Sequence, residues 1–330
     1  MNGKTIFLTG AGGSAIPGLI KQLKQKGFNV IAGDMDSFAV GLYLADKGFI
    51  LPKGSSSEFL PAIKRICRNE KIDAIVPLVD EELLAIIELE KENIPVILPR
   101  KNFIAICLDK YKLMKELASY HISVPKTKLA SEGCRDLTFP IIAKPRVGRG
   151  SRGVKILASE NEFDSYIDRQ NSPTSIILQE YIDGKEFTVS TVVWRDSQVQ
   201  GIVPKEIIQK RGVTKLAVTR RNSTVENVCL DIQEKLRADG PFNVQLRLDE
   251  SGKPFIFEIN PRFSTSISLT IASGMDELNL ILDRALTNKL KTDPIEWKEG
   301  IVLLRQTLDE FITEESFREH QNSILGGNDD

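Results

Sequence analysis

Two adjacent stretches of alternating polar and apolar residues carry the side chains best suited to holding a metal ion. The segment 242–260 reads as two strands joined by a polar turn at 250–253, which places Gln245 opposite Glu258. Because side chains alternate along a strand, Asn260 shares a face with Glu258. One carboxylate and two amide oxygens are hard ligands that Mg²⁺ or Mn²⁺ accepts beside phosphate oxygens. The pattern predicts a metal site, and taken alone it also fits the polar face of a surface hairpin.

A basic, glycine-rich loop upstream is suited to binding phosphate. An apolar strand at 139–143 ends in Lys144, and the loop that follows contains three glycines, three arginines and a serine before an apolar run resumes at Val154. Glycine lets backbone N–H groups approach an anion, and lysine adds a point charge. Since the lysine precedes the glycines, the loop does not match a Walker motif and predicts a hairpin lid, with a plain basic turn as the alternative. The candidate phosphate ligands are Lys144, Gly148, Gly150, Ser151 and Gly153.

A break between two strands offers groups for a base and a sugar. The apolar strand at 176–182 is followed by an Asp-Gly turn and a second strand. Such a break suits a link between two lobes, where backbone groups pair with the edge of an adenine ring and a carboxylate accepts from ribose hydroxyls. An ordinary strand-to-turn transition gives the same pattern. The candidate contacts are Glu180, Tyr181, Ile182 and Glu186.

Taken in this order, the candidate groups resemble the ATP-grasp superfamily. The motifs that carry the resemblance are Pro-Ile-Ile-Ala-Lys-Pro at 140–145 and Phe-Glu-Ile-Asn-Pro-Arg at 257–262. Within the superfamily the chain is most similar to one ATP-grasp unit of the carbamoyl-phosphate synthase large subunit and to stand-alone ligases of that type. The resemblance covers nearly everything from residue 1 to about residue 291, and no internal repeat suggests a second unit.

The resemblance implies a role for each candidate. The groups that contact ATP, from its phosphates to its adenine and ribose, would be Lys110, Lys144 and the loop around Gly150, then Glu180, Ile182 and Glu186. The metal ligands would be Gln245, Glu258 and Asn260, and Arg262 would handle the reacting phosphoryl or acyl group. One departure is that the synthase has a histidine near its ribose site, whereas His121 lies too early and His320 too late to match.

The implied fold class is α/β and α+β, with a Rossmann-like parallel α/β lobe before a two-lobed ATP-grasp domain. Alternating patterns over the first hundred residues agree with the parallel lobe and include a helix over 80–92 and a strand over 95–98. Further helices are predicted over 104–118 and 307–320. Asp80 and Glu81, where a strand ends and a helix begins, are candidate cleft residues. The expected units are a pre-ATP-grasp domain at 1–103, a small lobe at 104–185, a large lobe with the metal site at 186–290, and a C-terminal tail at 291–330.

The implied activity is an ATP-dependent ligase that phosphorylates a small-molecule carboxylate to an acylphosphate and joins it to an amine, releasing ADP and phosphate. Phosphorylation of bicarbonate or carbamate, as in the synthase, is one alternative. An NAD-dependent oxidoreductase is another, because Gly10, Gly12 and Ala15 with Asp34 downstream imitate a dinucleotide-binding turn. A tight strand-to-helix turn explains the same glycines.

Composition narrows the expected partners. A net charge of −1 argues against a nucleic-acid partner. The four cysteines stand singly, which disfavours zinc and disulfides, and no apolar stretch reaches the length of a membrane span, so we expect a cytoplasmic protein without a membrane partner. The expected partners are the carboxylate and the amine, with a homodimer as the candidate assembly. Three basic residues on the stretch 203–222 are candidates for holding an acidic substrate, with solvated charge on a mobile loop as the alternative: Lys205, Arg211 and Arg220.

Overall fold

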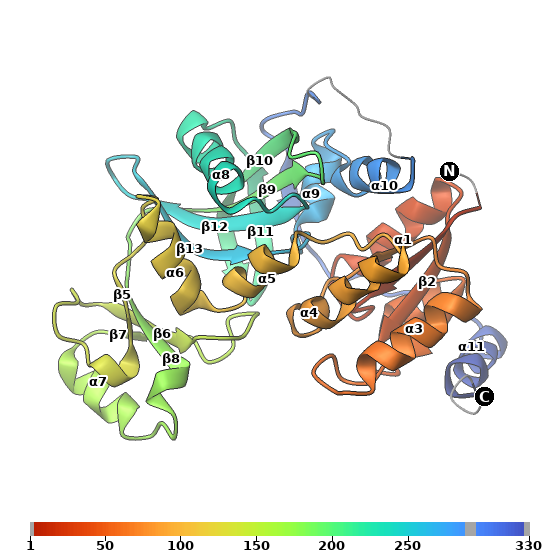
Figure 1. Cartoon of the computed structure of the whole chain (residues 1–330), viewed down its shortest axis with the longest axis horizontal. Helices are drawn as coiled ribbons and strands as arrows, with labels where there is room; N and C mark the ends of the chain where they lie inside the picture. Colours follow the sequence, from red (N-terminus) through yellow and green to blue (C-terminus); the bar gives the residue numbers. More distant parts are fainter. Residues whose placement is uncertain (1–2, 288–294, 327–330) are drawn as a thin grey trace.

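A parallel sheet forms the N-terminal layer of the computed structural model, which describes residues 3–287 and 295–326 (Figure 1). Its strand order is β3-β2-β1-β4, and its strands are β1 Thr5–Thr9, β2 Asn29–Asp34, β3 Lys47–Ile50 and β4 Ala74–Val76. Ile6 and Leu8 pack into one core cluster and Phe7 into another, so β1 is buried on both faces. Four helices cover the sheet, α1 Ile16–Gln25, α2 Val40–Leu44, α3 Phe59–Asn69 and α4 Leu83–Ile86.

Two predicted elements of this layer differ in the structure. The segment 95–98, expected to be a strand, makes only an isolated bridge between Ile75 and Val96. The helix expected over 80–92 is divided into two 3-10 turns around α4, η1 Asp80–Glu82 and η2 Ile87–Glu92. Glu82 explains part of the division, because its side chain accepts the backbone N–H groups of Leu78 and Val79 and holds η1 in a tight turn.

A six-stranded antiparallel sheet is the largest element of the chain. Its order is β13-β12-β9-β10-β11-β14, and its strands are β9 Lys185–Val193, β10 Val199–Arg211, β11 Val213–Thr219, β12 Phe242–Leu248, β13 Pro254–Asn260 and β14 Val302–Leu304. One face packs on α8 Ser223–Leu236 and on the helices described next. The other face is polar along part of its length and then packs on α9 Ile267–Ala272 and α10 Glu277–Thr287.

Two helices lead into the smaller sheet. The single helix expected over 104–118 is broken into α5 Lys101–Cys107 and α6 Lys110–Ser119. Asp109 causes the break, because its carboxylate caps the new helix by accepting from the backbone of Lys112 at 3.1 Å and also pairs with Arg146. As a result Lys110 occupies the first position of α6.

The smaller sheet is antiparallel, with the order β5-β8-β6-β7 and the strands β5 Thr127–Leu129, β6 Ile141–Pro145, β7 Lys155–Leu157 and β8 Ile176–Glu180. It packs on α7 Glu160–Ile167 and on the 3-10 turns η3 Ala130–Glu132 and η4 Pro173–Ser175. β6 and β7 form the hairpin that the sequence predicts around the glycine-rich loop. The parallel layer followed by two antiparallel sheets confirms the predicted fold class.

The chain returns to the N-terminal layer at its end (Figure 1). The helix expected over 307–320 begins later, as α11 Glu314–Gly326, and Phe317 stacks on Tyr43 of α2 with 5.0 Å between ring centroids. One apolar cluster joins residues of the N-terminal layer to Val192 and Val203 of the large sheet and to Trp194 just after β9, so the two parts share a core. The predicted limit at 290–291 and the tail beyond residue 326 lie outside the described residues. None of the helices within the described ranges has both the length and the apolar character that a membrane crossing requires.

Candidate functional site

The polar face of the large sheet carries the three predicted metal ligands. Gln245 of β12 lies directly opposite Glu258 of β13, as the sequence predicts, and Asn243 lies opposite Asn260. The Asn260 amide points toward the side chain of Asn243, which in turn donates to the backbone oxygen of Arg262 at 3.1 Å. The three oxygen-bearing side chains therefore share one face, and their role as metal ligands stays a prediction.

Lys144 lies almost completely buried at the end of β6. Its Nζ donates to Gln179 Oε1 at 2.8 Å and to the backbone oxygen of Phe257 at 3.3 Å. Burial lowers the pKa of Lys144 to about 8, and the nearby Glu258 carboxylate partly opposes that change. The two neutral acceptors hold the ammonium without neutralising it, so its charge is available to an anion.

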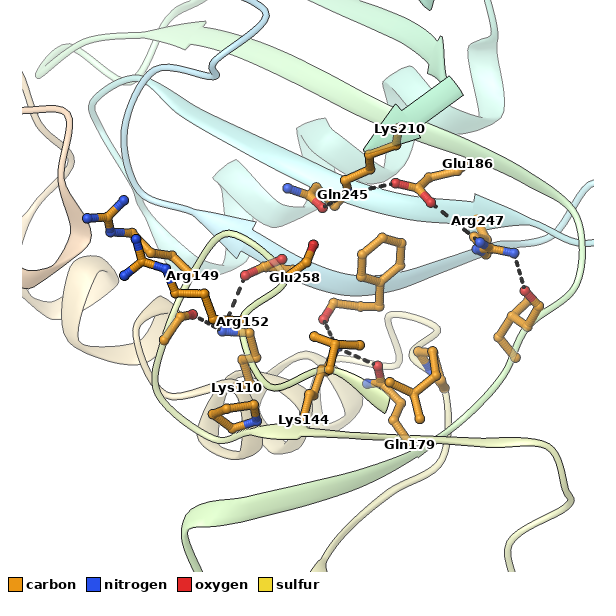
Figure 2. A pocket seen from close by; sticks show the side chains of 18 of the residues that line it. Lys110, Lys144, Arg149, Arg152, Gln179, Glu186, Lys210, Gln245, Arg247 and Glu258 are labelled. Carbon is orange, nitrogen blue, oxygen red and sulfur yellow. Dashed lines mark hydrogen bonds and ion pairs between the residues drawn. The ribbon is translucent and has the colours of Figure 1, made fainter. Parts of the chain in front are cut away.

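Lys110 connects the glycine-rich loop to the sheet. Its Nζ donates to the backbone oxygen of Gly148 at 2.5 Å and lies 3.3 Å from Glu258 Oε1. Figure 2 shows Lys110 and Lys144 reaching across the pocket toward the side of Gln245 and Glu258. Two lysines and one carboxylate therefore converge at the base of the loop.

The loop itself requires glycine at particular positions. Gly150 and Gly153 have φ of +68° and +71°, and a Cβ at Gly153 would lie 3.1 Å from the ring of Pro145. Arg149 leaves the loop and pairs with Glu81 of the N-terminal layer at 2.7 Å. The loop thus spans the space between β6 and the N-terminal layer.

A charged network lies at the other end of the pocket. Glu186 pairs with Lys210 at 2.9 Å and with Arg247 at 3.4 Å. Arg247 also donates to Tyr181 Oη at 2.9 Å and to the backbone oxygen of Ile182 at 3.1 Å. Together they place the candidate sugar and base contacts beside one another.

Glu180 turns away from that network. Its carboxylate accepts from the backbone N–H of Thr138 at 3.2 Å, and its own N–H donates to the backbone oxygen of Lys126 at 3.0 Å. Glu180 and Ile182 nevertheless line the same pocket as Glu186.

We call the space between these groups the inter-lobe pocket. It has a volume of about 160 Å³ and is lined by Lys110, Lys144, the loop residues Gly148, Arg149, Ser151 and Arg152, Glu180, Ile182, Glu186, Gln245 and Glu258, among others. Two further cavities of about 280 Å³ each adjoin it. The first, the turn cavity, lies between the glycine-rich turn at 10–15 and the segment 262–267, and it shares Arg149 with the pocket. The second, the strand-end cavity, contains Asn260 and shares Lys110, Gly148 and Glu258 with the pocket.

Arg262 follows β13 and lines the turn cavity. Its Nε pairs with Asp80 at 2.5 Å, and its Nη1 donates to the backbone oxygen of Phe263 at 3.1 Å. Within the described residues its Nη2 makes no hydrogen bond. Asp80 and Glu81, which the sequence suggests as cleft residues at a strand end, therefore hold one arginine each.

The stretch 203–222 is not a mobile loop. It belongs mostly to β10 and β11, because its alternating apolar residues pack into the sheet. Lys205 is fully buried, and its Nζ donates to Ser190 and Thr270, so it is neither a solvated charge nor exposed to a substrate, and its candidate role as a substrate contact is wrong. Arg220 pairs with Glu206 at 3.0 Å. Arg211 lines a separate surface groove.

Sequence reasoning missed four residues that line or support the inter-lobe pocket. They are Gln179, Lys210, Arg247 and Phe257. Arg247 was recognisable as sharing a face with Gln245, because side chains two positions apart lie on the same side of a strand. Gln179 carries no local signal, since it pairs with β6 over a long sequence distance. Lys210 is identified by its ion pair with Glu186 of another strand.

Comparisons with known proteins agree with this geometry. The model described as "ATP-grasp domain" matches residues 107–266, and the model described as "PylC-like, N-terminal domain" matches residues 6–97. The carbamoyl-phosphate synthase of Methanobrevibacter smithii is 21% identical over 288 residues, which cover 80% of this chain and 76% of that protein.

Two solved structures share the fold. The biotin carboxylase domain of Hydrogenobacter thermophilus 2-oxoglutarate carboxylase, in complex with MgADP, ADP and bicarbonate, superposes with a TM-score of 0.75 at 16% identity over 90% of this chain and 73% of that chain. The L-amino acid ligase from Bacillus licheniformis superposes with a TM-score of 0.69 at 19% identity over 87% of this chain and 75% of that chain. By its matches to the two family models, the chain carries an ATP-grasp domain that follows a PylC-like N-terminal domain.

Proposed function

We propose that the chain uses ATP to phosphorylate a small-molecule carboxylate and joins the resulting acylphosphate to an amine, releasing ADP and phosphate. The observation that carries the proposal is the adjacency of the three spaces. Arg149 lines both the inter-lobe pocket and the turn cavity, and Lys110, Gly148 and Glu258 line both the pocket and the strand-end cavity. A phosphate bound at these shared walls would have room beside it for two further reactants.

The nucleotide would lie along the inter-lobe pocket. Lys110, Lys144 and the loop at 148–153 supply positive charge and backbone N–H groups at one end, which suits the phosphates. Glu186 lies at the other end, within reach of a ribose. Ile182 lies beside it, in the break between β8 and β9. This arrangement supports the order of contacts that the ATP-grasp resemblance implies.

The polar sheet face fits a divalent cation such as Mg²⁺ or Mn²⁺. Within the described residues no group of three or more His, Cys, Asp or Glu side chains is placed to hold a metal on its own. One carboxylate and two amides in register, next to a phosphate-binding loop, suit an ion that takes its remaining ligands from phosphate. Gln245, Glu258 and Asn260 would hold it, and when bound it would neutralise charge on the phosphate oxygens.

The residues near the phosphates position the reactants and neutralise their negative charge, and they do not act as nucleophiles. The substrate carboxylate oxygen attacks the γ-phosphorus, the bond to the β-phosphate oxygen breaks, and ADP leaves. Lys144 and the free Nη2 of Arg262 would stabilise charge on the transferring oxygens. The amine nitrogen then attacks the acyl carbon, the phosphate departs with the C–O electron pair, and the nitrogen loses a proton to form the amide.

A product screen tests this function. Purified protein, MgATP and hydroxylamine would be incubated with amino acids, dipeptides, simple carboxylic acids and bicarbonate, and the products measured as ADP, phosphate and hydroxamate. We expect all three products in equal amounts with at least one organic carboxylate, because hydroxylamine intercepts an acylphosphate. ADP formation with bicarbonate alone would support the bicarbonate alternative, whereas AMP and pyrophosphate would show attack at the α-phosphorus and contradict the proposal.

A second measurement separates the oxidoreductase alternative. A ligand that binds only the folded protein raises its apparent melting temperature. We expect MgATP to raise it and NADH to leave it unchanged. A rise with NADH alone, accompanied by substrate-dependent loss of its absorbance at 340 nm, would overturn the ligase assignment.

A further inference from the structure

The turn cavity is the right size for a small substrate. Its volume of about 280 Å³ corresponds to roughly nine water molecules at about 30 Å³ each. Pockets that hold drug-sized ligands are commonly about 300–1,000 Å³, so the cavity has room for a ligand of about ten non-hydrogen atoms. It is closed by the glycine-rich turn on one side and by the segment 262–267 on the other.

A buried carboxyl group lies in the wall formed by the N-terminal layer. Glu82 is 4% exposed, and its Oε1 accepts from the Thr9 hydroxyl and from the backbone N–H groups of Leu78 and Val79 at 3.3 and 3.1 Å. Within the described residues no hydrogen bond to its Oε2 is found, and Oε2 is not among the buried atoms left without a partner, so it is open to the cavity that Glu82 lines. A carboxylate oxygen that faces a cavity can accept a hydrogen bond from a ligand.

A second carboxylate lines the same wall. Asp34 accepts from the backbone N–H of Gly12 at 2.8 Å, so the turn orients it. Burial raises the pKa of Glu82 to about 7, and a cation beside it would favour its charged form.

Two arginines line the same cavity. Arg262 and Arg149 come from the ATP-grasp domain, and each pairs with an acidic residue outside the lining, Asp80 and Glu81, on the turn η1 that also carries Glu82. Arg149 also lines the inter-lobe pocket, so its guanidinium group borders the space proposed for the phosphates. The cavity therefore offers both carboxylates and guanidinium groups to one small ligand.

We propose that the turn cavity binds an amino acid, with its ammonium group at Glu82 and Asp34 and its carboxylate directed toward Arg262. This inference rests on the proposed function, because the carboxylate so directed is the one to be phosphorylated. Arg149 selects this role because it lines both spaces, and an amino acid acting as the amine would need its nitrogen beside that guanidinium group. A monocarboxylate of equal size would leave Glu82 Oε2 without a donor.

The test compares amino acids with their analogues that lack the amino group. Binding would be measured by thermal shift with a non-hydrolysable ATP analogue and Mg²⁺, for each of the common L-amino acids and its des-amino acid. We expect at least one amino acid to raise the melting temperature while its analogue does not. In the hydroxamate assay its kcat/KM should exceed that of the analogue by tenfold or more, since an unpaired buried polar group costs 1–3 kcal/mol.

Variants of the two acidic residues test whether they bind the amino group. Glu82→Gln should raise the KM for the amino acid at least tenfold and leave the shift caused by MgATP unchanged, and Asp34→Asn should act in the same direction. The matched control is Glu58→Gln, an exposed glutamate of the same layer. Should Glu82→Gln fail to fold, the wild-type preference for amino acids over analogues and the Asp34→Asn variant decide the matter.

The outcomes separate the two proposals. Hydroxamate formed equally well from des-amino acids, or an unchanged KM in both variants, would overturn the amino-acid site and leave the ligase function standing. Amino-acid binding that depends on Glu82 without any ADP or hydroxamate would support the site and overturn the function. No thermal shift with any amino acid, while carboxylates still yield hydroxamates, would overturn the site alone.

Discussion

Lys144 is buried and carries a positive charge that no acidic residue of the described chain neutralises. Its contribution to MgATP binding can therefore be tested by varying the pH. Its pKa is lowered to about 8, and bound phosphate would raise it again. The lysine is charged below pH 8, so the Kd for MgATP should be constant there. Above pH 8 the Kd should rise up to tenfold per pH unit, because binding must then be accompanied by proton uptake.

Removing the positive charge of Lys144 should remove the pH dependence of MgATP binding. In Lys144→Met we expect MgATP binding to be about 10- to 100-fold weaker and nearly independent of pH between 7 and 10, because a hydrogen bond to a charged group contributes about 1.5–3 kcal/mol. Calorimetric titration measures both quantities, with the exposed Lys112→Met on α6 as the control. Wild-type affinity in Lys144→Met would remove Lys144 from the site.

Glu258 and Asn260 should be required for turnover and not for folding. Glu258→Gln and Asn260→Ala each remove an oxygen ligand from the polar sheet face, so we expect kcat to fall by at least 100-fold while the melting temperature without ligands stays within a few degrees. Asn243→Ala should have a smaller effect, since Asn243 only orients Asn260. Activity of either first variant at the wild-type rate would refute the metal assignment.

At this scale the sequence predicts a side chain's position only where local periodicity determines it. The pairing of Gln245 with Glu258 follows from two short strands and one turn, and the structure confirms it. Lys205 was placed wrongly, because nothing near it in the sequence shows that Ser190 and Glu277 bury it. The roles of the site residues stay predictions until the variants above are measured.

Among the elements, the glycine-rich loop is the one expected to move. It fills space at the phosphate end of a pocket of only about 160 Å³, and Lys110 and Glu81 hold it there. The Arg149–Glu81 pair is partly exposed and contributes about 0–1 kcal/mol, so the loop should open readily. Nucleotide entry therefore requires the loop to lift, and bound phosphates should hold it closed afterwards.

Limited proteolysis measures this motion. Trypsin should cleave at Arg149 or Arg152 in the free protein, and MgATP should slow that cleavage severalfold without changing cleavage at the exposed Arg135. Glu81→Gln should speed cleavage of the free protein, because it loses one of the two contacts. Equal rates with and without saturating MgATP would show that the loop is not a lid.

Helices and strands were predicted well where a long periodic pattern in the sequence specifies them. They were predicted poorly where a single tertiary contact determines where an element begins or ends. The hairpin of β6 and β7 and the parallel layer follow from apolar runs and turn residues. The break between α5 and α6 depends on Asp109, whose pairing with Arg146 joins two segments distant in sequence. The segment 95–98 has the composition of a strand but pairs with β4 at one position only.

The N-terminal layer and the large sheet share one apolar cluster, which contains both tryptophans, Trp194 and Trp297. We therefore expect them to unfold together. Intrinsic fluorescence and circular dichroism should report coincident thermal transitions. Phe263→Ala, in the same cluster, should destabilise the protein by about 3–5 kcal/mol, whereas Phe311→Ala, at a position 89% exposed, should leave the melting temperature unchanged. Fluorescence that changes well before circular dichroism would show that the two parts unfold separately.

At the scale of the whole molecule, the account requires that one oxygen atom pass from a carboxylate to phosphate. This can be measured with the carboxylate substrate from the product screen, labelled with ¹⁸O in both carboxyl oxygens, together with MgATP and the amine. Mass spectrometry or ³¹P NMR then follows the label in each phosphorus-containing product. We predict one ¹⁸O in each molecule of inorganic phosphate and none in ADP, because the carboxylate attacks the γ-phosphorus and leaves its oxygen there. Label in AMP, or unlabelled phosphate accompanying amide formation, would contradict the proposed acylphosphate mechanism.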